Sequence, residues 1–200
     1  MDFKLSEDLE MLKEMTREFA QNEIAPQADQ WDQDHYFPYE EVVKKMGELG
    51  MFGTVIPEEW GGNNMGWLAA SVITEEISRA SGSLRVQINL IGLGCALPIY
   101  RYATEEAKEK YIRKLVSAEY LGGFAITEPN AGSDIMAIKS TAEDKGDYYV
   151  LNGSKTWISN ASIADVIIYY AFTDKSKGGR GLSAFIIEPK NFEGVSTSDL

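Results

Sequence analysis

Two short segments of the chain carry residue types that could bind a ligand. The first is FAITEPNAGSD, residues 124–134, which we interpret as a strand that runs into a loop. Pro129 restricts the backbone of this loop, whereas Gly132 frees it. With the hydroxyls of Thr127 and Ser133 and several backbone N–H groups, such a loop can bind an anion such as a pyrophosphate. On local chemistry alone, a loop that only connects helix to sheet is the commoner interpretation.

The second segment is GSKTWISN, residues 153–160. If these residues form a strand, the side chains of Trp157 and Ser159 point to one face, because they lie two positions apart. An aromatic ring beside a hydroxyl suits a planar heteroaromatic ligand with hydrogen-bonding edges. The alternative interpretation is a tryptophan that packs in the core against a sheet.

The elements that must position both segments are predicted to be strands. Asn152-Gly153 lies between two strand-forming runs and predicts a tight type I′ hairpin turn. ADVIIYYAFTD and LSAFIIEP, which follow, are rich in β-branched and aromatic residues. The polar, glycine-rich residues 175–181 predict the turn between them. We therefore expect residues 121–200 to begin a β domain.

Before residue 121, the apolar residues recur at helical spacing. Ser6 and Thr104 are predicted to cap two helices, and Gly50 to end the helix over residues 39–49. Pro26 predicts a kink or break in the first helix, and residues 84–102 predict a helix buried on most sides. The other predicted apolar helix positions are Leu9, Leu12, Met15, Phe19 and Ala20; Ala69, Val72, Ile73 and Ile77; and Tyr111, Ile112 and Leu115.

Composition and missing motifs disfavour several classes of protein. The 200 residues carry a net charge of -12, which gives no footprint for nucleic acid or for an anionic membrane surface. No G-x-G-x-x-G follows a predicted strand, and no phosphate loop with Gly-Lys-Ser/Thr occurs. A nicotinamide Rossmann site and a nucleotide triphosphatase are therefore both disfavoured.

The single cysteine and the single histidine, Cys95 and His35, predict neither a zinc cluster nor a disulfide within the chain. We expect Cys95 to be a small buried residue and His35 to lie in a surface loop. The apolar residues 90–100 are too few to span a bilayer, and the start of the sequence lacks the apolar run of a secretory signal. The expected location is the cytoplasm, without membrane insertion.

FAITEPNAGSD followed by LNGSKTWISN resembles the paired flavin-site motifs of the acyl-CoA dehydrogenase family. MGELGMFGTVIPEEWGG resembles the family's segment at the end of its second helical stretch, and SLRVQINL is most similar to the glutaryl-CoA dehydrogenase branch. The resemblance implies an α+β fold, with an all-α amino-terminal domain over residues 1–120. A β-barrel-like middle domain would begin over 121–200, and a carboxy-terminal helical domain would lie beyond Leu200.

By the same resemblance, two groups of residues would bind non-covalent FAD. Backbone groups of the first motif and the Thr127 hydroxyl would meet the pyrimidine edge of the flavin, with Ser133 near the pyrophosphate. Trp157 would flank the isoalloxazine ring, and the Ser159 hydroxyl would bind the ring nitrogen that accepts hydride. The implied FAD residues are Phe124, Ala125, Ile126, Thr127, Gly132, Ser133, Trp157, Ile158 and Ser159.

The resemblance also implies substrate residues: Arg85, Val86, Ile91 and, near the CoA pantetheine, Ser133. Arg85 matches the arginine that binds the distal carboxylate of glutaryl-CoA, a task that suits a guanidinium fork. Val86 stands where some glutaryl-type enzymes have serine, and Ile91 where close relatives have an acidic residue in the acyl pocket. These two departures leave a cyclic or otherwise apolar acyl-CoA as a second substrate.

The implied reaction is α,β-dehydrogenation of an acyl-CoA thioester by a homotetramer, with an electron-transferring flavoprotein as the electron acceptor. The family's catalytic base belongs to the carboxy-terminal domain, so we expect no base among these residues and no turnover by residues 1–200 alone. We interpret Glu75, Glu128 and Asp134 as charges on a loop or a helix face. An acyl-CoA oxidase and a truncated, non-catalytic module that binds flavin or CoA are the alternatives.

Overall fold

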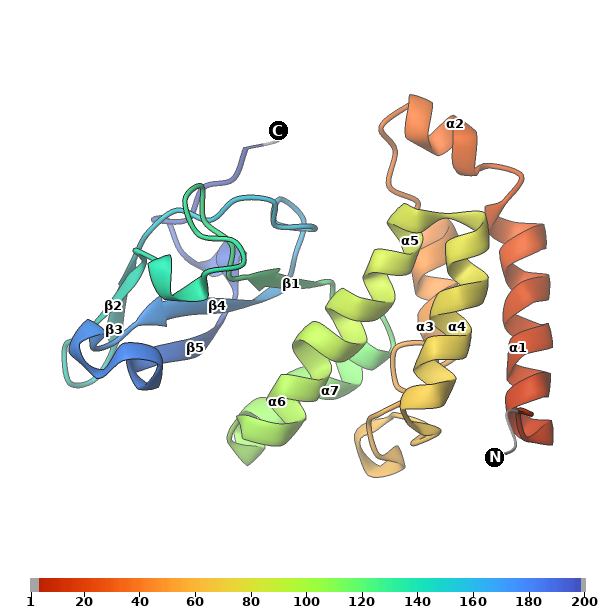
Figure 1. Ribbon diagram of the computed structural model, residues 1–200, viewed down its shortest axis with the longest axis horizontal. Coiled ribbons are helices and arrows are strands. Elements are labelled where there is room, and N and C mark those ends of the chain that lie inside the picture. Colours follow the sequence, from red (N-terminus) through yellow and green to blue (C-terminus); the bar gives the residue numbers. More distant parts are fainter. Residues whose placement is uncertain (1–3, 199–200) are drawn as a thin grey trace. The chain divides into compact units, whose positions relative to one another are not determined.

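The computed structural model describes residues 4–198 and divides the chain into two compact units, Met1–Tyr120 and Leu121–Leu200 (Figure 1). The first unit is helical and the second contains the sheet, which confirms the predicted α+β class. The helical unit consists of α1 (Glu7–Phe19), η1 (Ala20–Ile24), α2 (Ala28–Gln33), η2 (Tyr39–Val43), α3 (Lys44–Glu48), η3 (Glu58–Trp60), α4 (Gly66–Ala80), α5 (Gly82–Gln87), η4 (Ile88–Ala96), α6 (Leu97–Tyr102) and α7 (Glu105–Val116).

The helix caps lie where the sequence predicts them. The Ser6 hydroxyl accepts a hydrogen bond from the backbone N–H of Leu9 at the start of α1, and the Thr104 hydroxyl does the same at the start of α7. Gly50 follows the α3 helix with a left-handed backbone, φ +72°, which glycine adopts without steric cost. The first helix runs on through η1 to Ile24, so Pro26 follows the end of that helix.

The predicted apolar faces of α4 and α7 are buried in the helical unit. On α4 and α7, every predicted apolar position has less than a tenth of its surface exposed. Of the predicted apolar positions on the first helix, Leu12 and Ala20 are that deeply buried, whereas Leu9, Met15 and Phe19 are half-buried. Amphipathic spacing therefore identified the correct face in each case, and the depth of burial depended on the neighbouring helices.

The elements α5, η4 and α6 follow one another to form a helical run over residues 82–102. By length and composition this run, Gly82–Tyr102, could cross a membrane, but half of its apolar window is buried inside the chain. Ile91 and Cys95 are completely buried, and Gly92 lies against the backbone carbonyl of Phe52. The run therefore packs into the core along part of its surface, whereas its end is less buried than the sequence predicts for residues 84–102, since Tyr102 is 82% exposed.

The sheet of the second unit is organised around its longest strand, β4. Residues 166–169 of β4 pair in parallel with β1, and Phe172 pairs in parallel with Thr141 of β2. β5 pairs antiparallel with β4 along its length. The elements of this unit are β1 (Gly122–Ala125), η5 (Ile135–Ala137), β2 (Thr141–Asp144), β3 (Tyr149–Asn152), β4 (Val166–Phe172), η6 (Lys175–Gly181), β5 (Leu182–Ile187) and η7 (Pro189–Asn191).

The predicted hairpin turn at Asn152-Gly153 is wrong. β3 ends at Asn152, and it pairs instead with β2 across the turn at residues 145–148. There Gly146 has a left-handed backbone, φ +91°, and donates its N–H to the Asp144 carboxylate, which stabilises the turn. Gly153 has a different reason to be glycine, because a Cβ at this position would collide with Ser140.

The two faces of the sheet pack against different parts of the chain. On one face, Ala125, Ala164 and Ile167 form a cluster that Ile158, Tyr169 and Ile187 extend. On the other face, Ala131, Ile138 and Phe172 form a second cluster, which includes Ile126 and Leu182. Ala125, the last residue of β1, and Ile126, which follows it, thus contribute to opposite faces, as extended backbone geometry requires.

A buried ion pair between Glu128 and Lys155 lies at the end of β1. The Lys155 ammonium lies 2.9 Å from a Glu128 carboxylate oxygen, and both side chains are 6% exposed. The carboxylate also accepts bonds from the backbone N–H groups of Lys139 (2.7 Å) and Ser140 (3.0 Å) and from the Ser140 hydroxyl. Each charge is therefore paired and hydrogen-bonded, which is the condition for burying it.

Burial by itself would raise the pKa of the Glu128 carboxyl, because removal from water disfavours the charged form. The donors on Ser140, Lys139 and Lys155 outweigh that effect and bring the pKa down to about 2. Burial lowers the pKa of the Lys155 ammonium, and Glu128 offsets this only in part. The carboxylate of Glu128 is therefore the better hydrogen-bonded partner of the pair, since it accepts bonds from several donors.

We expect Glu128 to make the protein acid-sensitive. Its pKa in the folded state, about 2, lies below the ordinary 4.5, so the unfolded chain takes up the proton first and the stabilisation disappears as pH falls through this window. The wild type should lose on the order of 3 kcal/mol of its free energy of unfolding through this group as the pH falls, and Glu128→Gln should not show this loss. Urea unfolding of both proteins between about pH 7 and pH 2 measures the difference.

Glu143→Gln is the matched control, because Glu143 forms an exposed ion pair with Lys145 in the same unit. Solvent screens such a pair, so this variant should keep the pH dependence of the wild type. Equal pH dependence in Glu128→Gln and the wild type would contradict the prediction.

Candidate functional site

The two motif segments lie side by side in the sheet unit. The backbone N–H of Thr156 donates to the carbonyl of Thr127 at 3.0 Å, and the Lys155 ammonium donates to the carbonyl of Ile126 at 3.2 Å. At the other end, the Asn160 amide donates to the carbonyl of Gly122 at 3.0 Å. Residues 155–160 therefore run alongside β1 and the two residues that follow it.

The prediction that Trp157 and Ser159 lie on a strand is wrong. No strand covers residues 153–160, and Trp157 and Asn160 both have left-handed backbones, with φ of +59° and +65°. A tryptophan in this conformation costs on the order of 1–2 kcal/mol, and such residues cluster at functional sites. The Trp157 side chain is 74% exposed, so it is not a core tryptophan.

The apolar members of the predicted FAD set use their side chains for packing. The Phe124 ring contacts that of Tyr170, with centroids 5.2 Å apart. Ala125 and Ile158 join the cluster on one face of the sheet, and Ile126 joins the cluster on the other. A ligand at this edge would therefore meet these four residues chiefly through their backbones.

The polar and aromatic members of the set are more accessible. Thr127 is half-buried, whereas Ser159, Ser133 and Gly132 are exposed. Gly132 has an ordinary backbone conformation, and a Cβ there would meet nothing within 4 Å, so no contact among the described residues requires glycine at this position. The loop before it is a tight turn in which Glu128 and Ala131 exchange two backbone hydrogen bonds of 3.0 Å.

A hollow of about 1580 Å³ opens on the face of the sheet that carries Ala125. Its apolar wall comes from β4 and β5, and its rim includes residues 153–162 and 192–198. Of the predicted FAD residues it contacts Ala125, Trp157, Ile158 and Ser159, whereas Thr127, Gly132 and Ser133 do not line it. The hollow and the loop of the first motif are thus separate features of the unit.

The predicted substrate residues other than Ser133 lie on the helical run over 82–102. Arg85 and Val86 are half-buried on α5. Among the described residues, no hydrogen bond or ion pair engages the Arg85 side chain, which leaves its guanidinium available to an anion. Ile91 is completely buried within the helical unit, where its apolar character serves core packing.

Three carboxylates were interpreted as charges on a loop or a helix face. Glu75 pairs with Arg79 on the surface of α4, and Asp134 accepts the backbone N–H of Met136 to cap η5. Glu128 also follows β1 outside any helix or strand, but it is buried and paired with Lys155, which the sequence analysis did not predict. One signal for this ion pair was available in the sequence, because the first motif contains an acidic residue and the second contains a lysine. Sequence reasoning also missed Asn160, which connects the second motif to β1.

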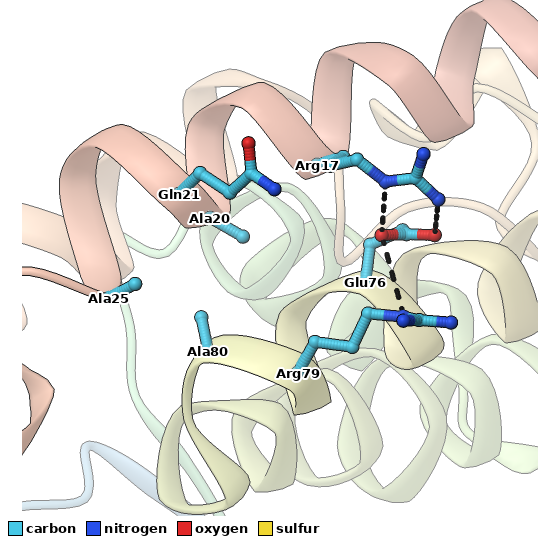
Figure 2. A pocket seen from close by; sticks show the side chains of 7 residues that line it. All are labelled: Arg17, Ala20, Gln21, Ala25, Glu76, Arg79 and Ala80. Atoms are coloured by element: carbon cyan, nitrogen blue, oxygen red, sulfur yellow. Dashed lines mark hydrogen bonds and ion pairs between the residues drawn. The ribbon is translucent and has the colours of Figure 1, made fainter.

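A smaller hollow of about 220 Å³ lies in the helical unit, between α1, η1 and α4 (Figure 2). The Arg17 guanidinium contacts the buried Glu76 carboxylate through two bonds of 2.9 and 2.8 Å. Arg79 lies 3.8 Å from the same carboxylate and also pairs with Glu75. The positive charges of this hollow are neutralised by neighbouring carboxylates, so it offers no net charge to an anionic ligand.

Residues 35 and 95 behave as the sequence predicts. His35 is exposed in a turn and Cys95 is completely buried. Within residues 4–198, no group of three or more His, Cys, Asp or Glu side chains could bind a metal ion.

Two family models match the chain: acyl-CoA dehydrogenase, N-terminal domain, over residues 6–119, and acyl-CoA dehydrogenase, middle domain, over residues 123–200. A glutaryl-CoA dehydrogenase of Desulfococcus multivorans is 64% identical over 202 residues, which covers 100% of this chain and 52% of the relative. The solved structure of a glutaryl-CoA dehydrogenase with glutaryl-CoA matches with a TM-score of 0.98 at 63% identity, covering 100% of this chain and 51% of that one.

The FAD complex of PigA matches with a TM-score of 0.88 at 34% identity, covering 94% of this chain and 49% of that one. The chain thus spans about half the length of the relatives it matches. The first family model alone matches more than half of the chain. Together with the position of the two motif segments beside β1, these matches confirm the resemblance seen in the sequence. The chain belongs to the acyl-CoA dehydrogenase family.

Proposed function

We propose that this chain forms the amino-terminal and middle part of an FAD-dependent acyl-CoA dehydrogenase that acts on glutaryl-CoA. The observation that carries the proposal is the connection of residues 155–160 to β1, which brings Thr127 close to the segment that contains Trp157 and Ser159. Hydroxyls, backbone groups and an exposed indole along one edge are the donor set that a planar heteroaromatic ring with polar edges needs.

The residues present fit FAD. The Thr127 and Ser159 hydroxyls and the backbone of residues 124–127 would bind the polar edges of the flavin, and Trp157 would flank its ring. Gly132 and Ser133 would bind the pyrophosphate from an exposed loop. When bound, the flavin would accept the hydride that leaves the β carbon of the acyl chain.

The protein residues would position the thioester and stabilise the charge that develops on it. An α proton beside a thioester is weakly acidic, so donors must stabilise the oxygen as the proton leaves. We assign the carboxylate that removes this proton to a carboxy-terminal domain, because the described carboxylates named above serve as ion pairs and caps. The proposed domains are residues 1–120, residues 121–200 and that further helical domain.

The glutaryl substrate is proposed from Arg85 together with the similarity to glutaryl-CoA dehydrogenases. A half-buried guanidinium without a protein partner among the described residues can bind the distal carboxylate in a bidentate way. The second candidate, a cyclic or apolar acyl-CoA, relied on the apolar Ile91. Since core packing accounts for Ile91, Arg85 makes glutaryl-CoA the better supported substrate.

We further propose an electron-transferring flavoprotein as the electron acceptor, a homotetrameric assembly and a cytoplasmic location. The chemistry requires an electron acceptor, because a reduced flavin must pass on its electrons before it can react again. An oxidase of the same fold would pass them to oxygen and form hydrogen peroxide instead. Peroxide formation during turnover therefore distinguishes these two enzymes.

Trp157→Ala and Ser159→Ala should each weaken FAD binding by roughly tenfold or more, because they remove a stacking surface and a hydrogen bond. The dissociation constant for FAD, measured by equilibrium titration of the apoprotein, reports the effect. Tyr102→Ala is the matched control, since Tyr102 is 82% exposed at the end of α6, outside both motifs and outside the hollow that Trp157 and Ser159 line. Binding of NAD in place of FAD would refute the proposed cofactor.

Arg85→Met should lower kcat/KM for glutaryl-CoA by roughly a hundredfold, because a carboxylate loses its charge-assisted partner. The value of kcat/KM for an uncharged acyl-CoA of the same chain length should fall far less. Arg101→Met, an exposed arginine on the same helical run, should leave both substrates unaffected. An equal fall in kcat/KM for both substrates in Arg85→Met would favour a cyclic or apolar acyl-CoA as the substrate.

Residues 1–200 expressed alone should not reduce an artificial electron acceptor in the presence of acyl-CoA and FAD. The reason is that proton removal needs a carboxylate within hydrogen-bond reach of the α carbon, and we assign that group to another domain. Measured turnover equal to that of the native polypeptide would place the base among these residues. Turnover by the native polypeptide, absent from these residues alone, would distinguish the dehydrogenase from a non-catalytic module that binds flavin.

A further inference from the structure

The Glu128–Lys155 ion pair connects the two motif segments. Neither side chain belongs to the proposed set of FAD-binding residues. Lys155 lies two residues before Trp157, and Glu128 directly follows Thr127. Their ion pair of 2.9 Å therefore joins a residue one position after Thr127 to a residue two positions before Trp157, and Thr127 and Trp157 are both proposed flavin contacts. A shift of either side chain would move the backbone that carries those contacts.

Lys155 makes further contacts that fix its position. Its ammonium donates to the carbonyl of Ile126 at 3.2 Å and lies 5.0 Å from the centre of the Tyr169 ring. Tyr169 in turn donates to the Ser140 hydroxyl at 3.1 Å, and Ser140 donates to Glu128. The pair is thus part of a closed network that includes strand β4 and both motif segments.

A buried ion pair contributes little net stability, because removing two charges from water costs about as much as their attraction returns. An apolar pair of similar volume would stabilise the sheet as well. What an apolar pair cannot supply is a donor for the Ile126 carbonyl or a fixed direction for the residues before Trp157. The network therefore determines geometry more than stability.

We propose that Glu128 and Lys155 are positioning residues, which set the backbone of residues 126–127 and of residues 156–159 in the arrangement that FAD binding requires. The inference rests on the proposed function for its ligand, and it adds two residues that lie outside the proposed set of flavin contacts. Trp157 supports it, because its left-handed backbone needs neighbours that fix it.

The test uses the native polypeptide that contains this chain, with the variants Lys155→Met, Lys155→Arg and Glu128→Gln/Lys155→Met. The double variant leaves no unpaired buried charge, so it should unfold at nearly the wild-type urea concentration. Lys190→Met is the control, because Lys190 forms an ion pair with Asp165 in the same unit and neither residue belongs to a motif segment.

Three readouts separate positioning from folding. Hydrogen exchange of the apoprotein at residues 126–127 and 156–159 should rise at least about tenfold in Lys155→Met and in the double variant. The dissociation constant for FAD should rise by a similar factor, and the flavin absorption bands of the bound form should shift. Lys155→Arg, which keeps the charge and the donors, should recover part of each effect, and Lys190→Met should match the wild type.

A double variant that folds with wild-type exchange, FAD affinity and flavin spectrum would overturn the proposal. If the wild type does not bind FAD, the proposed function fails, whereas the exchange rates of the apoprotein still decide whether the pair positions these segments. Increased exchange at residues 126–127 and 156–159, without a change elsewhere in the sheet, supports the positioning role in that case as well.

Discussion

The ion pair between Glu128 and Lys155 is the interaction on which the arrangement of the sheet unit depends. It joins the end of β1 to the segment after β3, and its acceptor also binds the backbone N–H groups of Lys139 and Ser140 where β2 approaches. Three stretches that are far apart in the sequence therefore share one carboxylate. Because burial makes each partner costly without the other, the three stretches must adopt their positions together.

This constraint explains why the chemistry lies beside a strand. Residues 155–160 have no ladder of their own, and they obtain their shape from bonds to the carbonyls of Gly122, Ile126 and Thr127. A Cβ at Gly123 would come 3.0 Å from the Ile167 side chain and only 3.6 Å from the Ser159 carbonyl oxygen, so the glycine leaves room chiefly for Ile167. The exposed indole of Trp157 thus belongs to an irregular segment that a regular element supports, which is a common arrangement for binding residues.

Much of the fold could be predicted from the sequence because its signals are local. Helix caps at Ser6 and Thr104 and the apolar faces of α4 and α7 depend on residues a few positions apart. The turn at Asn152-Gly153 was predicted wrongly because Gly153 is required by a distant neighbour, Ser140, and not by a turn. A local rule cannot distinguish these two reasons for a glycine.

The candidate site divides in the same way. The two motifs were identified from the sequence, whereas the strand expected over residues 153–160 was wrong and the burial of Glu128 against Lys155 was not predicted. Both errors concern residues whose conformation depends on a partner in the other motif. Ile91 shows the same limit, since the sequence gives its type but not its place inside the helical core.

The topology of β4 has a consequence for the order in which the chain folds. Among the described strands, β1 pairs only with β4, and Gly122 meets Val166 about forty positions later in the chain. The helices and the β2–β3 hairpin need only nearby residues, so they can form early. On the ribosome, β1 would wait without a partner until β4 emerges. The edge that carries both motifs would therefore be among the last parts of the sheet to form, and a nascent chain would gain its ligand affinity in one late step.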